Sequence, residues 1–357
     1  MAKRYSFLLI FTILIHINGV AQHSNLFFDF TGGSGRLIPH HPELNNLAGS
    51  VAFLNARLGI QTQGAKEWQR LYNYPQIGIG LSHNYLTKSF LGNPTSIYSF
   101  LNLPLNSGSK LKLDMGMHLG LAWGIHPFSE QNQQNVALGS KCAAYASLNL
   151  NASVRISQNI DLLLYAGGYH YSNGNTNKPN KGLNMLGTET GLRYTLQESC
   201  TYRNTDPVKP KEPGSSIMLF GALGWKKEAT YSSQYRVGTL SAGYYRSINN
   251  KSRLSAGIDL FYDEGILYYT IKENRLNNVV AAGLFGGHEL TFDKFSIVTQ
   301  IGIYLRNPHP FDPFYYERLG LRTIIAKRIV PSISLKAHEF KIDFVEWGVG
   351  FILWNSK

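Results

Sequence analysis

Apolar and polar residues alternate strictly over several stretches of this chain. The clearest stretch is LKLDMGMHLGLAW, residues 111–123, in which every odd position is Leu, Met or Trp. The even positions hold Lys, Asp, Gly, His or Ala. A period of two indicates a β-strand with two unlike faces, and a strand of this length can cross a bilayer at a tilt. Strands of soluble sandwiches are usually shorter, about five or six residues.

Similar segments recur along the whole chain, and no segment has a convincing helical period. We place sixteen strands, an even number as in bacterial barrels, although the boundaries allow between twelve and sixteen. The predicted strands cover residues 24–33, 48–60, 75–86, 96–105, 110–124, 141–154, 160–173, 184–197, 216–226, 233–247, 253–264, 277–290, 293–305, 316–326, 331–338 and 340–353. The pattern therefore predicts an all-β fold, an antiparallel transmembrane β-barrel of about sixteen strands.

The connections support this topology, because barrels of this class have short periplasmic turns and longer external loops. Short turns such as NSGS, SQN and NNKS fall on one side, and long loops such as HPFSEQNQQNVALG fall on the other. Two long connections, residues 61–75 and 197–216, fall on the side of the short turns. The second is rich in Pro, Lys and Ser, so the linker 198–215 is a candidate junction between two parts of the barrel.

The N-terminus has the features of a secretory signal peptide. Lys3 and Arg4 precede the apolar run at residues 6–15, and small residues follow at Gly19 and Ala21. The run is too short for a spanning helix. We therefore expect a signal peptide at residues 1–21 and an exported barrel at residues 22–357.

Composition agrees with an exported membrane barrel. The chain has 35 Gly, 21 Tyr and 19 Phe, and only 16% of its residues are charged, against roughly a quarter in soluble proteins. The net charge of +12 fits either contact with anionic lipid headgroups or scattered solubilising charge. Beyond this charge the chain has no nucleic-acid-binding motif. No metal or cofactor site is predicted, and His40 and His41 are interpreted as surface histidines.

Candidate chemistry lies in the segment GGYHYSNGNTNKPNKGLN, residues 167–184. The even-numbered face of the strand before it is apolar until it ends in His170 and Ser172, so both side chains should face lipid at the outer rim. An ionisable residue there suggests a function. In the next strand Glu189 and Arg193 belong in the lumen, which leaves Asn184 on the lipid face. The hairpin should bring Asn184 beside His170.

This constellation would suit nucleophilic attack on an acyl carbonyl. Ser172 would attack, His170 would take its proton, and Asn184 would hold the imidazole tautomer, as Asn does in Cys-His-Asn sites. The candidates for the oxyanion hole are Asn173 and the backbone N–H groups of Gly174 and Asn175. The competing interpretation is a strand end with ordinary polar rim residues.

The segments HYSNG and KPNKGLN resemble the active-site region of the lipid A 3-O-deacylase (PagL-like) and acyloxyacyl hydrolase family of outer-membrane barrels. The resemblance implies that His170 is the base, Ser172 the nucleophile and Asn173 an oxyanion donor. It also implies lipopolysaccharide as the substrate, attacked at an ester-linked acyl chain of lipid A, and no metal or other cofactor. Lys178 and Lys181 in the same loop would then contact the lipid A phosphates.

The chain departs from the family pattern in two ways. The family's Glu falls at Asn184, and an amide can orient a histidine but cannot neutralise its charge. The family's typical member is a barrel of about eight strands, roughly half of this chain. The resemblance itself covers only residues 165–185.

The sequence therefore predicts a serine-type esterase in the cell outer membrane, acting on lipid A in the outer leaflet. An alternative is a non-catalytic channel or assembly barrel with a degenerate motif, which the extra strands and the missing Glu favour. A third, a soluble secreted sandwich, remains open on composition.

Overall fold

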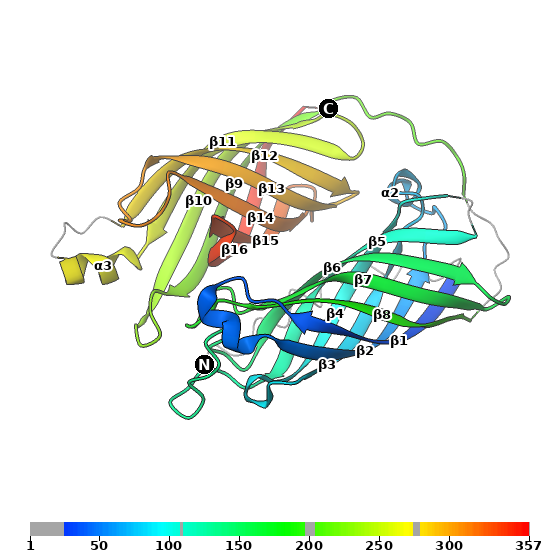
Figure 1. Ribbon diagram of the computed structural model, residues 1–357. Helices are drawn as coiled ribbons and strands as arrows, with labels where there is room; N and C mark the ends of the chain where they lie inside the picture. Colours follow the sequence, from blue (N-terminus) through cyan, green and yellow to red (C-terminus); the bar gives the residue numbers. More distant parts are fainter. Residues whose placement is uncertain (1–24, 108–109, 197–203, 274–278, 357) are drawn as a thin grey trace.

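The computed structural model describes residues 25–107, 110–196, 204–273 and 279–356 (Figure 1). The predicted signal peptide lies outside these residues. The sixteen predicted antiparallel strands are confirmed: β1 (Asn25–Leu37), β2 (Gly49–Gln61), β3 (Gln76–Leu86), β4 (Gly92–Pro104), β5 (Leu111–Ile125), β6 (Ala143–Arg155), β7 (Ile160–Ser172), β8 (Leu183–Thr195), β9 (Ser215–Lys227), β10 (Gln234–Ser247), β11 (Ser252–Asp263), β12 (Val280–Phe292), β13 (Phe295–Arg306), β14 (Tyr315–Thr323), β15 (Ile329–His338) and β16 (Lys341–Asn355).

The strands close as two barrels and not as the single barrel that the alternation predicted. β1–β8 form the first barrel and β9–β16 the second, as Figure 1 shows in blue to green and in green to red. Only two pairings separate the two outcomes. β1 pairs with β8 and β9 pairs with β16, where one large barrel would need β8 beside β9 and β1 beside β16. The candidate junction at 198–215 lies in the chain between β8 and β9.

Alternation places apolar side chains outside each barrel and mostly polar or aromatic ones inside. On β7, Leu162 is 47% exposed and Leu164 is 53% exposed, whereas Tyr165 and Tyr171 point into the barrel and are buried. An exposed apolar belt of this kind is what a lipid-facing barrel surface requires. No helix within the described residues has the length and apolar character needed to cross a membrane.

Ion pairs and aromatic rings fill the interior of both barrels. Four buried arginines there each bond to a buried carboxylate, which offsets the large cost of taking both charges out of water. The closest N–O distances are 3.1 Å for Arg57–Glu189, 2.7 Å for Arg193–Asp29, 2.8 Å for Arg318–Glu346 and 2.7 Å for Arg322–Glu289. A barrel of eight strands is just wide enough to be filled by such side chains.

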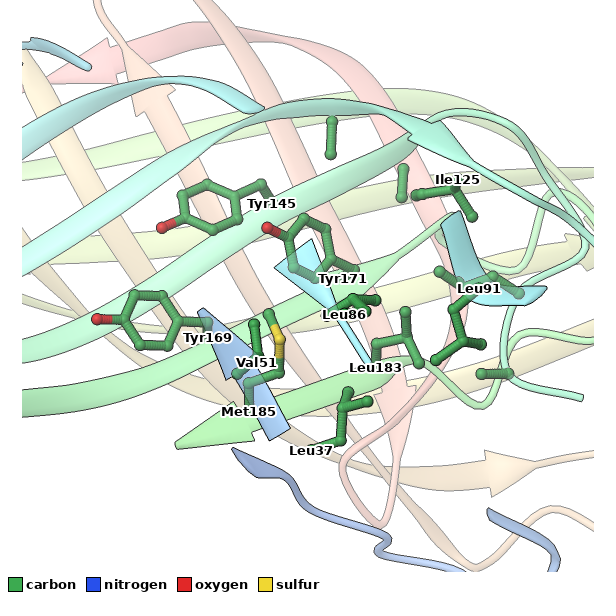
Figure 2. Close-up of a cluster of buried hydrophobic side chains, with 14 of the residues drawn as sticks. Leu37, Val51, Leu86, Leu91, Ile125, Tyr145, Tyr169, Tyr171, Leu183 and Met185 are labelled. Atoms are coloured by element: carbon green, nitrogen blue, oxygen red, sulfur yellow. The ribbon is translucent and has the colours of Figure 1, made fainter. Parts of the chain in front are cut away.

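A cluster of buried apolar residues, the plug, lies at the end of the first barrel that bears the connections 38–48, 87–91, 126–142 and 173–182. This is the end that we predicted to be the outer end. Figure 2 shows this cluster, which includes Leu37, Val51, Leu86, Leu91, Ile125, Tyr145, Tyr169, Tyr171, Leu183 and Met185. The plug lies at the barrel end that bears the segment 167–184. It therefore gives the strand ends of this segment a rigid support.

Short helices occupy several connections, so the expectation of no helix is wrong for these segments. They are η2 (Pro42–Leu47), α2 (Glu67–Leu71), η3 (Ser89–Leu91) and α3 (Ile266–Glu273). α2 explains one of the two unexpectedly long connections at the inner end. Tyr72, directly after α2, stacks on Phe292 of the second barrel with ring centroids 4.3 Å apart, and burial raises the pKa of Tyr72 to about 12. This long connection therefore joins the two barrels.

Candidate active site

The register of β7 and β8 pairs His170 with Asn184. This is the neighbour that we predicted from the alternation of side chains between the two faces of each strand. Asn184 Oδ1 lies 2.5 Å from His170 Nδ1. Because a carbonyl oxygen only accepts hydrogen bonds, His170 donates from Nδ1. Both side chains lie on the same outward face as Leu162 and Leu164.

Asn184 has a second partner that the sequence did not indicate. Its Nδ2 lies 2.9 Å from Nδ1 of His40, in the connection between β1 and β2. Nε2 of His40 lies 2.8 Å from the backbone oxygen of Lys181. His40 is exposed, as predicted for a surface histidine, yet both of its ring nitrogens are engaged.

Ser172 is on the outward face of β7 but is buried by the loop that follows it. Its Oγ lies 3.0 Å from Asn180 Nδ2 and accepts a hydrogen bond from the Gly174 N–H at 3.2 Å. Ser172 Oγ also lies 3.2 Å from Asn180 Oδ1. Among the described residues, no hydrogen bond joins Ser172 to His170. The structure thus brings His170 together with Asn184, and Ser172 together with the loop, on one rim.

The loop 173–182 is held from both sides. Its far end bonds to the connection between β5 and β6, where the Gly139 N–H donates to Pro179 O at 2.7 Å and the Lys181 N–H donates to Ala137 O at 2.9 Å. The Asn173 side chain turns into the loop and donates to Asn177 O at 3.0 Å. Its amide nitrogen is therefore already engaged in holding the loop.

The near end of the loop rests on the second barrel. Asn175 Nδ2 donates to Asp343 O at 2.8 Å, and the Lys227 N–H donates to Asn175 O at 3.0 Å. Gly174 has a φ of +66°, and a Cβ there would lie 2.3 Å from a methyl of Val345. Glycine is therefore required at 174 both by the backbone conformation and by the close approach of the second barrel.

A second glycine fits against the candidate base. Gly182 has a φ of +76°, and a Cβ there would lie 2.7 Å from His170 Cε1. The backbone of the loop thus covers one edge of the imidazole. Together with the hydrogen bond to Asn184, this contact restricts the ring of His170.

The two lysines of the loop have different surroundings. Lys181 pairs with Glu43, and the two side chains are 30% and 67% exposed, so this is an exchangeable surface pair. Lys178 is half-buried, and burial lowers its pKa while the nearby Glu228 raises it. Lys178 therefore lies near charged groups of the second barrel, Glu228, Lys226 and Asp343.

Glu189 was predicted to face the lumen, because it alternates with the lipid-facing residues of its strand. It is buried in the lumen and accepts a hydrogen bond from the Tyr169 hydroxyl at 2.7 Å. It is therefore not a third member of the rim site. Asn180 and His40 are the site residues that sequence reasoning missed. Asn180 lies in the quoted motif KPNKGLN, which was a usable signal. His40 had no local signal because it is 144 positions from Asn184.

Among the described residues, one group of side chains has a geometry suited to a metal, and it lies in the second barrel. Ligand atoms of Asp312, His338 and Asp343 lie within 4.8 Å of one another. However, Lys226 and Lys336 place ammonium groups 2.9 and 2.7 Å from the oxygens of Asp343. These two cations already supply the positive charge that a metal would bring.

Comparison with known proteins gives an independent reading of each barrel. Residues 52–193 match the model of lipid A 3-O-deacylase (PagL), and residues 215–355 match that of the acyloxyacyl hydrolase C-terminal domain. The first match lies within the first barrel and the second spans β9–β16. No curated protein matches the chain.

Solved structures add little. A Rhodopseudomonas blastica porin with three substitutions is 8% identical, with 92% of this chain and 100% of that chain covered and a TM-score of 0.18. Another variant of that porin is 9% identical, with the same coverage and a TM-score of 0.17. The two family matches confirm the resemblance, and the chain belongs to the lipid A 3-O-deacylase (PagL-like) and acyloxyacyl hydrolase family of β-barrel proteins.

Proposed function

We propose that this protein is an outer-membrane esterase that removes an ester-linked acyl chain from lipid A. The family matches support this substrate class. The position of the site supports the same substrate, because His170 and Asn184 lie at the rim of an apolar outer surface. Lipid A in the outer leaflet would reach this rim laterally and would not need to enter the barrel.

In the proposed mechanism Ser172 is the nucleophile and His170 the base. Since His170 donates from Nδ1 to Asn184, its Nε2 carries the lone pair that can take the Ser172 proton. Oγ attacks the ester carbonyl, and His170 gives the proton to the departing alkoxide oxygen, which becomes a hydroxyl of lipid A. Water then attacks the acyl-serine with His170 again as base, which releases the fatty acid and restores Ser172.

Two donors beside Ser172 are proposed for the oxyanion hole. The Gly174 N–H and Asn180 Nδ2 are 3.2 and 3.0 Å from Ser172 Oγ, and the oxyanion is the carbonyl oxygen on the carbon that Oγ attacks. Of the three predicted oxyanion residues, Gly174 is therefore the best placed. The side chains of Asn173 and Asn175 hold the loop. The Asn173 N–H donates to Asn180 Oδ1 at 2.9 Å, so the backbone N–H of Asn175 is the candidate that remains. One such donor is typically worth about 10²–10³ in rate.

The catalytic step requires Ser172 and His170 to approach one another. Side chains two positions apart on one strand face are separated by about 6.6 Å, which an imidazole and a hydroxyl can span. In the resting structure Ser172 instead bonds to Asn180. Catalytic hydrogen bonds of free enzymes are often looser than those of substrate complexes, so substrate binding would release Ser172 from Asn180 toward Nε2 of His170.

Lys181 is the stronger candidate for a lipid A phosphate contact. Its pair with Glu43 is exposed, so a phosphate can replace the carboxylate at little cost. Lys178 remains a weaker candidate, because it is half-buried beside the second barrel.

One observation carries the proposal: a hydrogen-bonded His170–Asn184 pair on the lipid-facing rim, beside a serine whose oxygen is surrounded by donors. Mass spectrometry of lipid A from cells that express the protein tests it. We expect loss of one acyl mass with the wild type and no loss with Ser172→Ala or His170→Ala.

Ser252→Ala is a matched control. Ser252 lies outside the second barrel with Oγ 3.1 Å from His288 Nε2, so it is also a serine bonded to a histidine. We expect this variant to deacylate lipid A like the wild type. Unchanged lipid A in every strain would refute the enzyme.

A channel is not favoured by the structure. Both barrel interiors contain buried arginine–carboxylate pairs, and an apolar plug closes the outer end of the first barrel. The extra strands that suggested a channel form a second filled barrel and do not widen the first.

A further inference from the structure

His40 joins the connection after β1 to the candidate site on β8. The Ile38 N–H donates to Asn184 O at 2.8 Å, which brings the chain over the start of β8. His40 then contacts the Asn184 amide through Nδ1 at 2.9 Å and Lys181 O through Nε2 at 2.8 Å. Two separate contacts therefore fix the orientation of the ring.

These contacts determine the position of each proton. A backbone oxygen only accepts, so His40 Nε2 carries a hydrogen, and the neutral ring then has its lone pair on Nδ1. The amide group that faces this lone pair must be the NH₂ of Asn184. Its Oδ1 is therefore turned toward His170, where it lies 2.5 Å from Nδ1.

We propose that His40 is a positioning residue of the esterase site, which sets the orientation of the Asn184 amide and thereby the tautomer of His170. This inference rests on the proposed function. With the amide in the observed orientation, His170 carries its hydrogen on Nδ1 and offers Nε2 as a base. With the amide reversed, Nδ2 would donate to His170 Nδ1, the hydrogen would lie on Nε2, and the base would be lost.

The need for His40 follows from the departure at position 184. A carboxylate accepts hydrogen bonds through both oxygens, so it presents an acceptor to His170 in either orientation. An amide has one accepting and one donating end and requires a third group to choose between them. His40 supplies that choice in a chain where Asn184 occupies the position of the family's Glu.

Steady-state kinetics of the full chain in detergent on purified lipid A test the proposal. His40→Ala should lower kcat about tenfold, the effect of losing one hydrogen bond of ordinary strength, and should leave KM unchanged. His40→Gln can still accept from Asn184 and should recover most of the rate. His41→Ala is the control, because the tilted ring of His41 lies beside His40 with centroids 4.7 Å apart, while the side-chain partners of Asn184 among the described residues are His170 and His40.

Testing His40→Ala in the wild type and in an Asn184→Glu variant distinguishes a positioning role of His40 from a structural one. In Asn184→Glu, which removes the need to orient an amide, adding His40→Ala should change kcat less than threefold. An equal loss in both backgrounds, or no loss in the wild-type background, would overturn the proposal.

A readout without activity distinguishes this proposal from the proposed function. In ¹⁵N-histidine NMR spectra of the protein in micelles, His170 should show an Nδ1–H tautomer in the wild type and a mixture in His40→Ala. If the wild type proves inactive on lipid A but the tautomer shifts, the esterase is wrong and the positioning holds. An unchanged tautomer in His40→Ala would refute the positioning, whatever the activity.

Discussion

The hairpins of the seventh and eighth strands differ between the two barrels, although both barrels have eight strands and interior arginine–carboxylate pairs. In the first barrel the long loop 173–182 joins β7 to β8, and His170 faces outward. In the second barrel only Glu339 and Phe340 join β15 to β16, with φ values of +51° and +61°. Two consecutive residues with positive φ form the tightest kind of hairpin turn.

The side chains at these two hairpins point in opposite directions. β7 places His170 on the outer face, whereas β15 buries Lys336 and His338 inside. Asp343, at the start of β16, bonds to Lys336 Nζ at 2.7 Å. The barrel scaffold alone therefore does not determine the candidate chemistry. That chemistry depends on which face of the strand the histidine occupies and on the length of the loop after it.

A serine next to a histidine is also insufficient. The second barrel has the direct Ser252–His288 contact that Ser172 and His170 lack in the resting structure. Ser252, however, begins a strand after a tight turn, and its own N–H donates to Asn249 Oδ1. It has no loop of donors around its oxygen among the described residues. We take this supply of donors to be what distinguishes the candidate site.

The two barrels are coupled at both ends. At the outer end the loop 173–182 rests on Asp343, Val345 and Lys227, and at the inner end Tyr72 stacks on Phe292. We therefore expect the second barrel to support the loop 173–182 beside Ser172, and the following substitutions test that expectation.

The largest expected effect comes from the buried charges of the second barrel. Lys226 Nζ lies 2.6 Å from Asp263 and 2.9 Å from both Glu228 and Asp343. Lys226→Met would leave these carboxylates without their cation and should lower the free energy of unfolding by about 3–5 kcal/mol. Urea unfolding followed by gel mobility measures this.

The control for Lys226 is Lys341→Met. Lys341 forms an exposed pair with Glu339 at 3.5 Å, so its loss should cost about 0–1 kcal/mol. Equal costs for the two substitutions would show that the buried cluster is not important for stability.

The next effect concerns Gly174. Gly174→Ala places a Cβ 2.3 Å from Val345 at a φ of +66°, so the loop and its N–H must shift. Deacylation should fall about 10²–10³-fold, the typical loss of one oxyanion donor. Gly221→Ala, where nothing lies within 4 Å of the added Cβ, should leave the rate unchanged. A fully active Gly174→Ala would show that catalysis does not depend on the contact of this loop with the second barrel.

A smaller effect is expected at Asn175. Asn175→Gly keeps the backbone N–H and the φ of +65° but removes the hydrogen bond to Asp343 O. We expect the rate to fall about tenfold, in line with one hydrogen bond of roughly 1 kcal/mol. Asn73→Gly, an exposed position at the inner end with a φ of +56°, is the matched control, and a similar loss there would contradict the coupling.

The smallest effect is expected at Lys181. If it contacts a lipid A phosphate, Lys181→Ala should raise KM a few-fold, by the energy of an exposed ion pair, and leave kcat unchanged. The same substitution should have no effect on a dephosphorylated lipid A. Glu43→Ala should lower KM slightly, because it removes the competing carboxylate.

The strands could be predicted from sequence because alternation is local, and each lies within a few residues of its expected position. The pairing of His170 with Asn184 was also local, since one hairpin joins them. Closure into two barrels was not predictable by alternation, because only the pairings of β1 with β8 and β9 with β16 distinguish it. The contacts of His40 with Asn184 and of Asn175 with the second barrel join residues far apart in the chain.

In the proposed mechanism the serine at the outer rim of the first barrel, Ser172, is the nucleophile. Peptide mass spectrometry after reaction of the full chain with a fluorophosphonate lipid tests it directly. We expect a phosphonate adduct on Ser172 that disappears in His170→Ala. An adduct on Ser252, or no adduct on Ser172 in a chain that still deacylates lipid A, would contradict it.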